Sequence, residues 1–423
     1  MSKYLFFALF LYSLSAWAQS TTLTWRDCLL QVEQHSPQAE LLPLIKQAAD
    51  LQVALLQKNN LPQATASAQA TWQSAVTSLP SELPVGLGIE SPSRWQYKAN
   101  IDINQNIWDG GSTRQQQALA RANATAEAEK LKTDLYSLRE QANALFFGVL
   151  LAEKQIGNAQ LLQKDLMAKK RKAEQLRSGG LATGSQIWVI DARLLELEQQ
   201  IAETQNRKDA ALQTLAWLTG NLAVQQATLL PETAAPPANT TPIARPELAY
   251  FKAQRDAIDA SEKLIKAKSS PKIGAFVSGG LGRPALNMLS NSIEPYAIGG
   301  LQLRVPLGYL YSKSSHIERQ QIAVNKAKNT QMEAQWTWLL QSKAIAQRAD
   351  IDRYTQLLHQ DQALIELREK IRQTAEVQLE NGIITPADYL TEANNADLAR
   401  QNLIIHELQH AQAIAALRLT LGY

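Results

Sequence analysis

The sequence contains an internal duplication, so that its two halves are similar. Residues 173–220 align without a gap with residues 375–422 at an offset of 202, so that AEQLRSGGLATGSQIW corresponds to AEVQLENGIITPADYL. The same offset pairs Gly180 with Gly382. A chain of two equivalent halves is typical of a quasi-symmetric assembly, and it argues against an enzyme with one unique pocket.

The two repeats follow a secretory signal. Residues 1–18 contain a basic residue, the apolar stretch LFFALFLYSL and a small-x-small cleavage motif before Gln19, which is the pattern of a signal peptide. We expect the first repeat over residues 19–225, a linker rich in Ala, Pro and Thr over 226–245, and the second repeat over 246–423. The mature protein is therefore expected to leave the cytoplasm.

Composition narrows the class of protein. The 42 Lys and Arg residues nearly balance the 39 Asp and Glu residues, for a net charge of +3, so the sequence gives no reason to expect nucleic-acid binding. No stretch after the signal approaches the roughly 18 consecutive apolar residues of a membrane-spanning helix. Insertion into a membrane would therefore have to use β-strands. The single cysteine, Cys28, is expected to be a small buried residue on a helix.

Long helices account for most of the chain. In each half one long helix is flanked by two shorter ones, expected over about 28–58, 109–177 and 184–219 and over about 246–268, 312–379 and 386–420. The first long helix carries apolar residues at alternating steps of four and three: Leu131, Leu135, Leu138, Ala142, Leu145, Val149, Ala152, Ile156 and Ala159. This 3.5-residue repeat predicts coiled-coil packing. At about 1.5 Å per residue the helix would be on the order of 100 Å long, so we expect the two short helices to stack end to end, antiparallel to it.

Short strands interrupt the helices at about 63–73, 95–107, 272–281 and 296–305. The second strand alternates most clearly, with an apolar face formed by Trp95, Tyr97, Ala99, Ile101 and Ile103. About ten residues of this pattern match a transmembrane β-strand whose apolar face lies against lipid. A pair of hairpins in a soluble sheet is the alternative interpretation. In the fourth strand the apolar phase switches near Gly299-Gly300, and a β-bulge at these glycines would explain it.

Several segments resemble the TolC family of outer-membrane efflux proteins, and the resemblance covers nearly all of the mature chain. They are LTWRDCLLQVEQHSPQ at the start, IWDGG and VPLGYLYSK where a strand precedes a long helix, and the turn sequences SGGLATGSQIW and ENGIITPADYL. The resemblance implies an α+β membrane protein that forms a homotrimer in the outer membrane of a Gram-negative bacterium. Four strands per chain would form a twelve-stranded transmembrane β-barrel in contact with outer-membrane lipid, and the helices would form a long antiparallel coiled-coil tunnel in the periplasm. Four strands alone would leave open edges in lipid.

The resemblance also implies a function. The protein would be the passive outer-membrane channel of a tripartite efflux or type I secretion system, opened by a periplasmic adaptor protein and an inner-membrane pump. The sequence contains no G-x-S-x-G, P-loop or Rossmann motif, so we expect no enzymatic activity and no cofactor, and the energy for transport would come from a partner. A periplasmic coiled-coil adaptor is the alternative, although adaptors usually contain one helical hairpin and not two equal halves.

The turn sequence of the first repeat predicts a helical tip. Gly179 and Gly180 would end one helix in a left-handed C-cap, and Thr183 with Gln186 would form a capping box for the next. The resemblance implies that such tips form the periplasmic end of the tunnel, which is closed at rest and contacted by the adaptor.

The second repeat predicts an equivalent tip. Asn381 and Gly382 would end the helix, and Thr385 would cap the next one, with Pro386 at its first position and Asp388 three residues after the cap. At the tip glycines of both repeats, Gly180 and Gly382, we expect close approach and left-handed backbone geometry to leave no room for a side chain.

Asp388 is also a candidate gate residue. The resemblance implies that its carboxylate projects into the lumen, where three copies would form an anionic constriction that attracts cations. The family often has a second aspartate three residues later, and here that position is Thr391. The constriction is therefore expected to be weaker or differently built, and Asp388 could instead act only as a capping residue.

One motif points to a different chemistry. His406-Glu407-Leu408-Gln409-His410 matches the H-E-x-x-H signature of zinc proteases on a predicted helix. Such sites need a third protein ligand, usually downstream, but only AQAIAALRLTLGY follows, which contains no His, Asp, Glu or Cys. A zinc metalloprotease is therefore a remote alternative, and we expect no bound metal.

Overall fold

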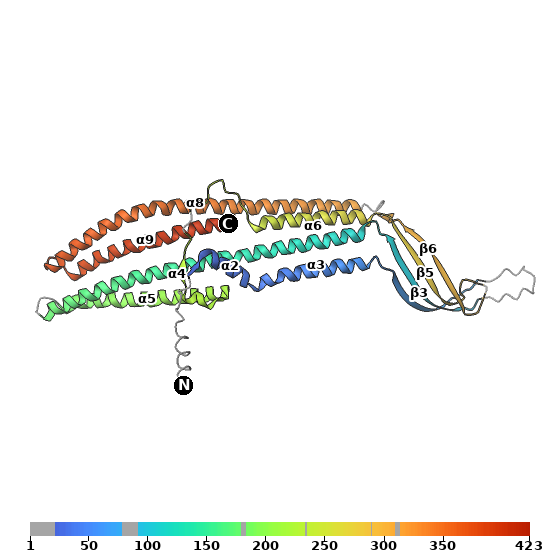
Figure 1. Cartoon of the computed structure of the whole chain (residues 1–423), viewed down its shortest axis with the longest axis horizontal. Helices are drawn as coiled ribbons and strands as arrows, with labels where there is room; N and C mark the ends of the chain where they lie inside the picture. The colour runs from blue at the N-terminus through green and yellow to red at the C-terminus, as the bar shows by residue number, and fades with distance from the viewer. Residues whose placement is uncertain (1–21, 78–91, 179–182, 233–234, 289, 309–313) are drawn as a thin grey trace, which may run out of the picture. The chain divides into compact units, whose positions relative to one another are not determined.

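The structure is a computed structural model that describes residues 22–77, 92–178, 183–232, 235–288, 290–308 and 314–423. The chain divides into two compact units. Unit 1 contains the described residues up to Glu40 together with Leu131–Pro246 and Gln335–Tyr423, and unit 2 contains Leu41–Lys130 and Glu247–Ala334. Each unit therefore draws on both halves of the chain (Figure 1).

The helices repeat in length as well as in order. Those of the first half are α2 (Trp25–His35), α3 (Leu41–Lys58), α4 (Ser112–Ser178) and α5 (Gly184–Thr219), and those of the second half are α6 (Pro246–Lys268), α8 (Ser314–Glu380) and α9 (Pro386–Leu421). The long helices α4 and α8 have 67 residues each, and α5 and α9 have 36 each. The duplication seen in the sequence is thus a duplication of helical hairpins.

The first short helix differs from the expectation of one helix over about 28–58. It is divided into α2 and α3 by a 3-10 turn at Pro37–Glu40. Pro37 has no backbone N–H to donate and its ring disfavours a helical conformation for Ser36. The backbone N–H of Ser36 still donates to the carbonyl of Val32, so α2 ends at the proline and the chain resumes as α3.

The heptad pattern of α4 forms the core of unit 1. Of the nine residues in the predicted seam, Leu131, Leu135, Ala142, Val149, Ala152, Ile156 and Ala159 are buried, and Leu138 and Leu145 pack partly buried against them. Cys28 is buried in the same cluster, and burial raises the pKa of its thiol to about 12. The predictions of a coiled-coil seam and of a buried Cys28 are confirmed.

The linker between the repeats also belongs to unit 1. A short strand β1 (Thr22–Thr24) pairs in parallel with β4 (Thr228–Leu230), which follows the 3-10 turn Leu222–Gln226. Arg245, at the end of the linker, lies over the ring of Tyr136 at 4.4 Å and donates to the carbonyl of Leu419 at 3.0 Å. The linker is thereby fixed to both α4 and α9.

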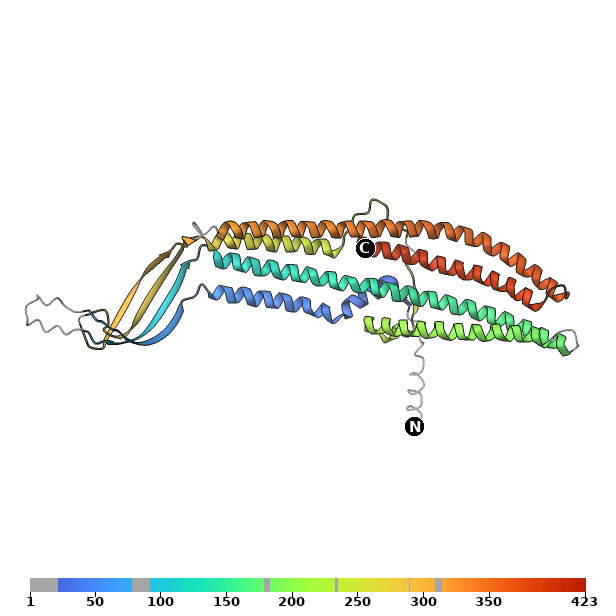
Figure 2. The same ribbon diagram turned by 180° about the vertical axis from the view of Figure 1, so that it is seen from behind.

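Unit 2 contains one antiparallel sheet of four strands. They are β2 (Gln63–Trp72), β3 (Trp95–Trp108), β5 (Lys272–Arg283) and β6 (Glu294–Arg304), in the order β2-β3-β5-β6. Both views show β3, β5 and β6 side by side (Figures 1 and 2). Within the described chain β2 and β6 each pair on one side only, so a single copy leaves the sheet open at both edges.

The register gives the sheet one continuous apolar face. Three successive rows across all four strands consist of Ala68, Ala99, Leu281 and Pro295, then Ala66, Ile101, Gly279 and Ala297, then Ala64, Ile103, Val277 and Gly299. Of the predicted lipid-facing residues, Trp95, Tyr97, Ile101 and Ile103 are all more than 40% exposed in the single chain, and Ala99 is exposed as well. The opposite face carries Ser67, Asn100 and Asp102, which form hydrogen bonds with one another.

The bulge expected at Gly299-Gly300 is absent. The pairing of β5 with β6 runs unbroken through both glycines, which lie opposite Val277 and Phe276. A Cβ atom at Gly300 would lie 3.2 Å from the Phe276 ring, so this glycine leaves room for the phenyl group. The register shift lies instead between Asn106 and Trp108 of β3. The apolar phase switches in β6 because Tyr296 and Ile298 lie on the same face as Asn100 and Asp102, opposite to the apolar face, while the pairing of β6 with β5 stays in register.

None of the helices in the described part of the chain is both long enough and apolar enough to cross a membrane.

Candidate functional site

The turn between α8 and α9 has the predicted cap. The Thr385 hydroxyl accepts from the backbone N–H of Asp388, while the Asp388 carboxylate accepts from the backbone N–H and the hydroxyl of Thr385 at 3.0 and 2.7 Å. Pro386 occupies the first turn of α9. The helix before it ends at Glu380, and Gly382 has φ of +69°. The predicted Thr385 cap and the helix end at Asn381-Gly382 are therefore present, and Asp388 completes a reciprocal capping box with Thr385.

Of the two reasons expected for Gly382, the left-handed backbone is present, but the close approach is not seen within the described part of a single chain. A Cβ atom added to this glycine would meet no described atom within 4 Å, so the turn has room for a side chain. The left-handed backbone alone accounts for the glycine, because other residues reach that conformation at a cost of about 1 kcal/mol or more.

The first tip is described only in part. Gly179 and Gly180 lie outside the described residues, as does the side chain of Gln186. The hydroxyl of Thr183 lies 3.0 Å from that of Ser185, and α5 begins at Gly184. The capping box of the first tip stays a prediction.

Asp388 and Thr391 border one groove. The groove, of about 510 Å³, lies between α8 and α9 and is also lined by Lys370, Ile371, Thr374, Ala375, Gln378, Ile384 and Glu392. Asp388 is exposed, and its hydrogen bonds from Thr385 lower the pKa of its carboxyl. It therefore carries its charge down to a lower pH than an ordinary aspartate. Thr391 donates to the carbonyl of Ala387 one turn earlier on α9.

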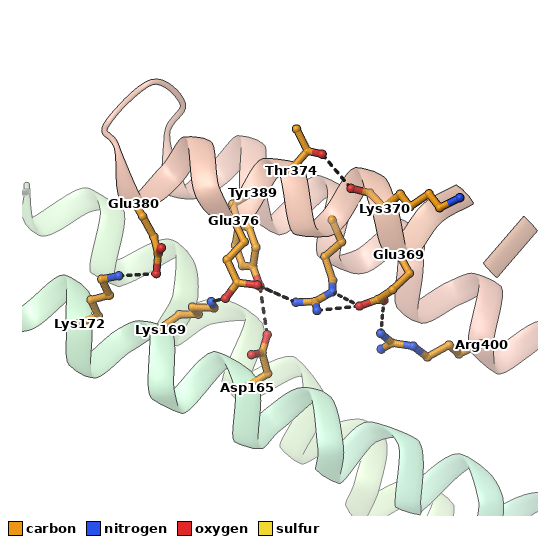
Figure 3. Close-up of polar contacts among 11 residues, drawn as sticks. Asp165, Lys169, Lys172, Glu369, Lys370, Thr374, Glu376, Glu380, Tyr389 and Arg400 are labelled. Atoms are coloured by element: carbon orange, nitrogen blue, oxygen red, sulfur yellow. Dashed lines mark hydrogen bonds and ion pairs between the residues drawn. The ribbon is translucent and has the colours of Figure 1, made fainter. Parts of the chain in front are cut away.

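A second group of polar residues joins the hairpin of the second repeat to that of the first (Figure 3). At its centre Tyr389, which is 1% exposed, donates a hydrogen bond to Asp165 of α4 at 3.2 Å. The ammonium group of Lys169 lies 5.1 Å from the centre of the tyrosine ring. Burial, with a further contribution from Asp165, raises the pKa of Tyr389 to about 12, so the hydroxyl stays protonated and can donate.

Ion pairs surround this tyrosine. Glu376 of α8 accepts from Lys169 of α4 and from Arg372 of its own helix. One turn closer to the tip, Lys172 pairs with Glu380 at 2.6 Å (Figure 3). The pair between α4 and Glu376 is mostly shielded from water, whereas both members of the outer pair are about half exposed.

The same contact continues away from the tip. Arg372 forms two hydrogen bonds with Glu369, which raise the pKa of the guanidinium and lower that of the carboxyl. Arg400 of α9 binds the other oxygen of Glu369. We name the polar residues that join α4 to α8 and α9 the inter-hairpin network: Asn158, Asp165, Lys169, Lys172, Glu369, Arg372, Glu376, Glu380, Tyr389, Asp397 and Arg400.

Sequence reasoning missed this network, although Tyr389 directly follows the predicted Asp388. A heptad pattern tells which residues of one helix share a face, but it does not tell which face of another hairpin they meet. A large aromatic residue next to a capping residue was the one signal that could have drawn attention to the site.

The H-E-x-x-H motif lies on α9 and faces α8. The His406 ring nitrogen Nδ1 is 2.6 Å from the carboxylate of Asp361, and His410 lies 3.2 Å from the hydroxyl of Thr355. Among the described residues no three His, Cys, Asp or Glu side chains are grouped to hold a metal ion. The two histidines therefore have separate partners on α8.

Known proteins share this architecture. Residues 33–221 match the family model described as outer membrane efflux protein. No curated protein matches the sequence. Among solved structures, the outer-membrane channel OprN has a TM-score of 0.70 at 15% identity, with 94% of this chain and 89% of that chain covered. The CmeC outer membrane channel of Campylobacter jejuni has a TM-score of 0.68 at 13% identity, with 94% and 85% covered.

A third structure extends the likeness. The MtrE outer membrane channel of Neisseria gonorrhoeae, solved in an open state, has a TM-score of 0.63 at 14% identity, with 94% and 88% of the two chains covered. The partial family match and the fold are both those of outer-membrane channels, which favours the channel over the adaptor and the zinc protease. The first half of this chain thus resembles the outer membrane efflux protein family, and the fold of the chain is that of solved outer-membrane channels.

Proposed function

We propose that three copies of this chain form a passive conduit from periplasm to exterior, opened at its periplasmic end by an adaptor and an inner-membrane pump. The observation that carries the proposal is the sheet of unit 2, which has one continuous apolar face and two open edges. In lipid every backbone N–H and C=O needs a partner. Three such sheets joined edge to edge satisfy these groups and turn the apolar face to the lipid.

The helices next to the sheet edges support the same assembly. Helix α3 leads into the edge strand β2, and α8 follows the edge strand β6. Each presents exposed apolar residues at heptad spacing, with Leu44 and Leu51 on α3 and Ile317 and Val324 on α8 all more than half exposed. Stripes of this kind on a solvated helix favour pairing with another helix. We assign them to contacts between neighbouring copies.

The tips supply the entrance in this proposal. Asp388 and Thr391 border the groove of the α8–α9 tip, and three Asp388 carboxylates around an axis would concentrate negative potential. The inter-hairpin network holds the hairpin that carries Asp388 against its neighbour within one chain, which favours a resting state with the tips together. The tip residues Thr183, Asn381, Gly382, Thr385 and Pro386, with Gly179, Gly180 and Gln186 of the first tip, are the surface proposed for the adaptor.

Site-specific photo-crosslinking in cells tests this arrangement. A crosslinker at Ile383, which is 70% exposed in the tip turn, should capture a periplasmic protein of the adaptor class. A crosslinker at Leu55, also exposed but on α3, should capture a second copy of this chain and no adaptor. Capture of only the chain itself from Ile383, with no self-capture from Leu55, would refute the proposed assembly.

A further inference from the structure

Asp397 is a carboxylate buried between the two hairpins. It lies on α9, is 2% exposed, and accepts a hydrogen bond from the amide of Asn158 on α4 at 2.8 Å. Its second oxygen accepts from Gln401, one turn later on α9, at 2.7 Å. The equivalent position of the first repeat is Leu195, so this charge has no counterpart in the other hairpin.

The basic groups around Asp397 form their ion pairs with other residues. Arg400 of α9 and Arg372 of α8 both pair with Glu369, and Arg193 of α5 pairs with Glu196. Arg193 and Arg400 act on Asp397 only as nearby charges. Among the described residues the Asp397 carboxylate therefore accepts from two amides and forms no direct ion pair.

A polar cavity adjoins the carboxylate. The cavity is about 200 Å³ in volume and is lined by Asn158, Leu161, Leu162, Asp165, Arg372, Ala393, Asp397 and Arg400. The acidic Asp165 of α4 therefore borders the same cavity as Asp397. Removing a carboxylate from water disfavours its charged form unless paired, and burial accordingly raises the pKa of Asp397 against the opposing effects of Asn158 and Arg400.

We propose that Asp397 is a proton-sensitive latch, which weakens the contact between the two hairpins while it is charged and strengthens that contact when it takes up a proton. The proposal rests on the proposed function, in which the hairpins separate as the entrance opens. Separation would bring Asp397 into water and remove the burial that disfavours its charge. The closed state would then bind a proton more tightly than the open state, so acid favours closure.

The pH window follows from the direction of the shift. At a pH above the raised pKa of Asp397, the residue is charged in both the open and the closed state. Only the closed state buries this charge, so the burial then destabilises closure. In the open state Asp397 would have a pKa near 3.8, the ordinary value for aspartate, whereas burial raises its pKa in the closed state. As the pH falls, the closed state therefore takes up a proton before the open state does. The open-to-closed ratio then falls by up to about tenfold for each unit between the two pKa values. Asp388 stays charged at lower pH than an ordinary aspartate, because Thr385 lowers its pKa.

Single-channel recording of the purified full-length assembly in planar bilayers tests the latch. The fraction of time spent conducting is measured from about pH 7.5 to about pH 4.5. For the natural protein we expect this fraction to fall with acid. For Asp397→Asn, which mimics the neutral form, we expect a low fraction at both ends of the range. Asp209→Asn, at an exposed aspartate on α5 that also accepts from an amide, should follow the natural protein.

A second variant tests the latch even if Asp397→Asn does not assemble. Asn158→Ala removes a hydrogen bond that favours the charged carboxylate, so the acid response should move to higher pH. An unchanged acid response in Asp397→Asn, or an unshifted response in Asn158→Ala, would overturn the latch. Absence of any conducting channel from the natural protein would instead count against the proposed function.

Discussion

The Tyr389 hydroxyl of α9 donates to the Asp165 carboxylate of α4 at 3.2 Å, in the middle of the inter-hairpin network. The bond joins the hairpin of the second repeat, which carries the proposed gate residue, to the hairpin of the first. Because the tyrosine is buried and stays protonated, this contact is maintained over the whole physiological pH range.

Tyr389→Phe should favour the open entrance. The variant keeps the ring over Lys169 and removes only the hydroxyl, and a hydrogen bond of this kind contributes about 0.5–1.5 kcal/mol. The open-to-closed ratio in single-channel recordings should rise by roughly 2- to 10-fold. The control is Thr374→Ala, whose hydroxyl donates to the Lys370 carbonyl within α8. Equal changes in the two variants would show that the link to Asp165 does not hold the entrance closed.

The ion pairs of the network should differ in strength. Glu376→Gln weakens the shielded contacts with Lys169 and Arg372, and we expect the open-to-closed ratio to rise by roughly 5-fold, or about 1 kcal/mol. Glu380→Gln weakens only the exposed pair with Lys172 and should change the ratio little. The recordings should be made at low and high salt, because salt screens the exposed pair more. A larger effect for Glu380→Gln would contradict this ranking.

Two neighbouring glycines of β5 should tolerate alanine very differently. A Cβ atom at Gly280 would lie 2.1 Å from the Ala99 carbonyl oxygen, whereas one at Gly279 would lie 3.7 Å from its nearest neighbour, the Tyr296 carbonyl oxygen. Gly280→Ala must displace backbone, at a cost of about 1–3 kcal/mol or more, and Gly279→Ala needs no displacement. The yield of heat-modifiable oligomer on gels should fall for the first variant only. Comparable yields would show that β3 and β5 do not approach this closely.

Arginine substitutions on the two faces of β3 should have unequal effects on assembly. Ile101 lies on the apolar face of the sheet and Asn100 on the opposite face. Ile101→Arg should cost roughly 2–4 kcal/mol per chain near the middle of the bilayer and prevent assembly, whereas Asn100→Arg should assemble. Barrel yields are measured after extraction of outer membranes. If the two yields are alike, the lipid-facing side of the strand has been assigned wrongly.

Asp388→Asn should change conduction and leave stability nearly unaltered. Asparagine retains an oxygen that can accept from Thr385, but it removes the negative charge from the proposed constriction. Cation preference and block by multivalent cations should both decrease. A variant with unaltered selectivity and a lower melting temperature would show that Asp388 is a capping residue only.

The fold could be predicted from local patterns, because each acts within one element. The 3.5-residue repeat from Leu131 to Ala159 shows which side of α4 is buried, and the alternation from Trp95 to Ile103 shows which side of β3 is apolar. The one helix expected over about 28–58 is divided at Pro37, because proline lacks a backbone N–H and disfavours a helical conformation for the residue before it. The bulge expected in β6 is absent because Tyr296 and Ile298 are apolar side chains on the face that carries Asn100 and Asp102 in β3, and a regular strand with such residues shows the same change of phase as a bulge.

The parts of the candidate site that could be predicted are those whose interacting residues lie close together in the sequence. The capping box of Thr385 and Asp388 spans three residues and could be recognised from spacing. The contacts from Tyr389 to Asp165 and from Asp397 to Asn158 join residues more than 200 positions apart. They depend on how one hairpin is rotated against the other, and one sequence contains no periodic signal for that rotation.

The most direct measurement is of the purified mature protein reconstituted in lipid, for which mass and conductance are determined on the same preparation. We predict a particle of three chains that conducts ions across a bilayer and whose conductance changes in Asp388→Asn. A single-chain particle that stays in aqueous solution without detergent and conducts no ions would contradict the account.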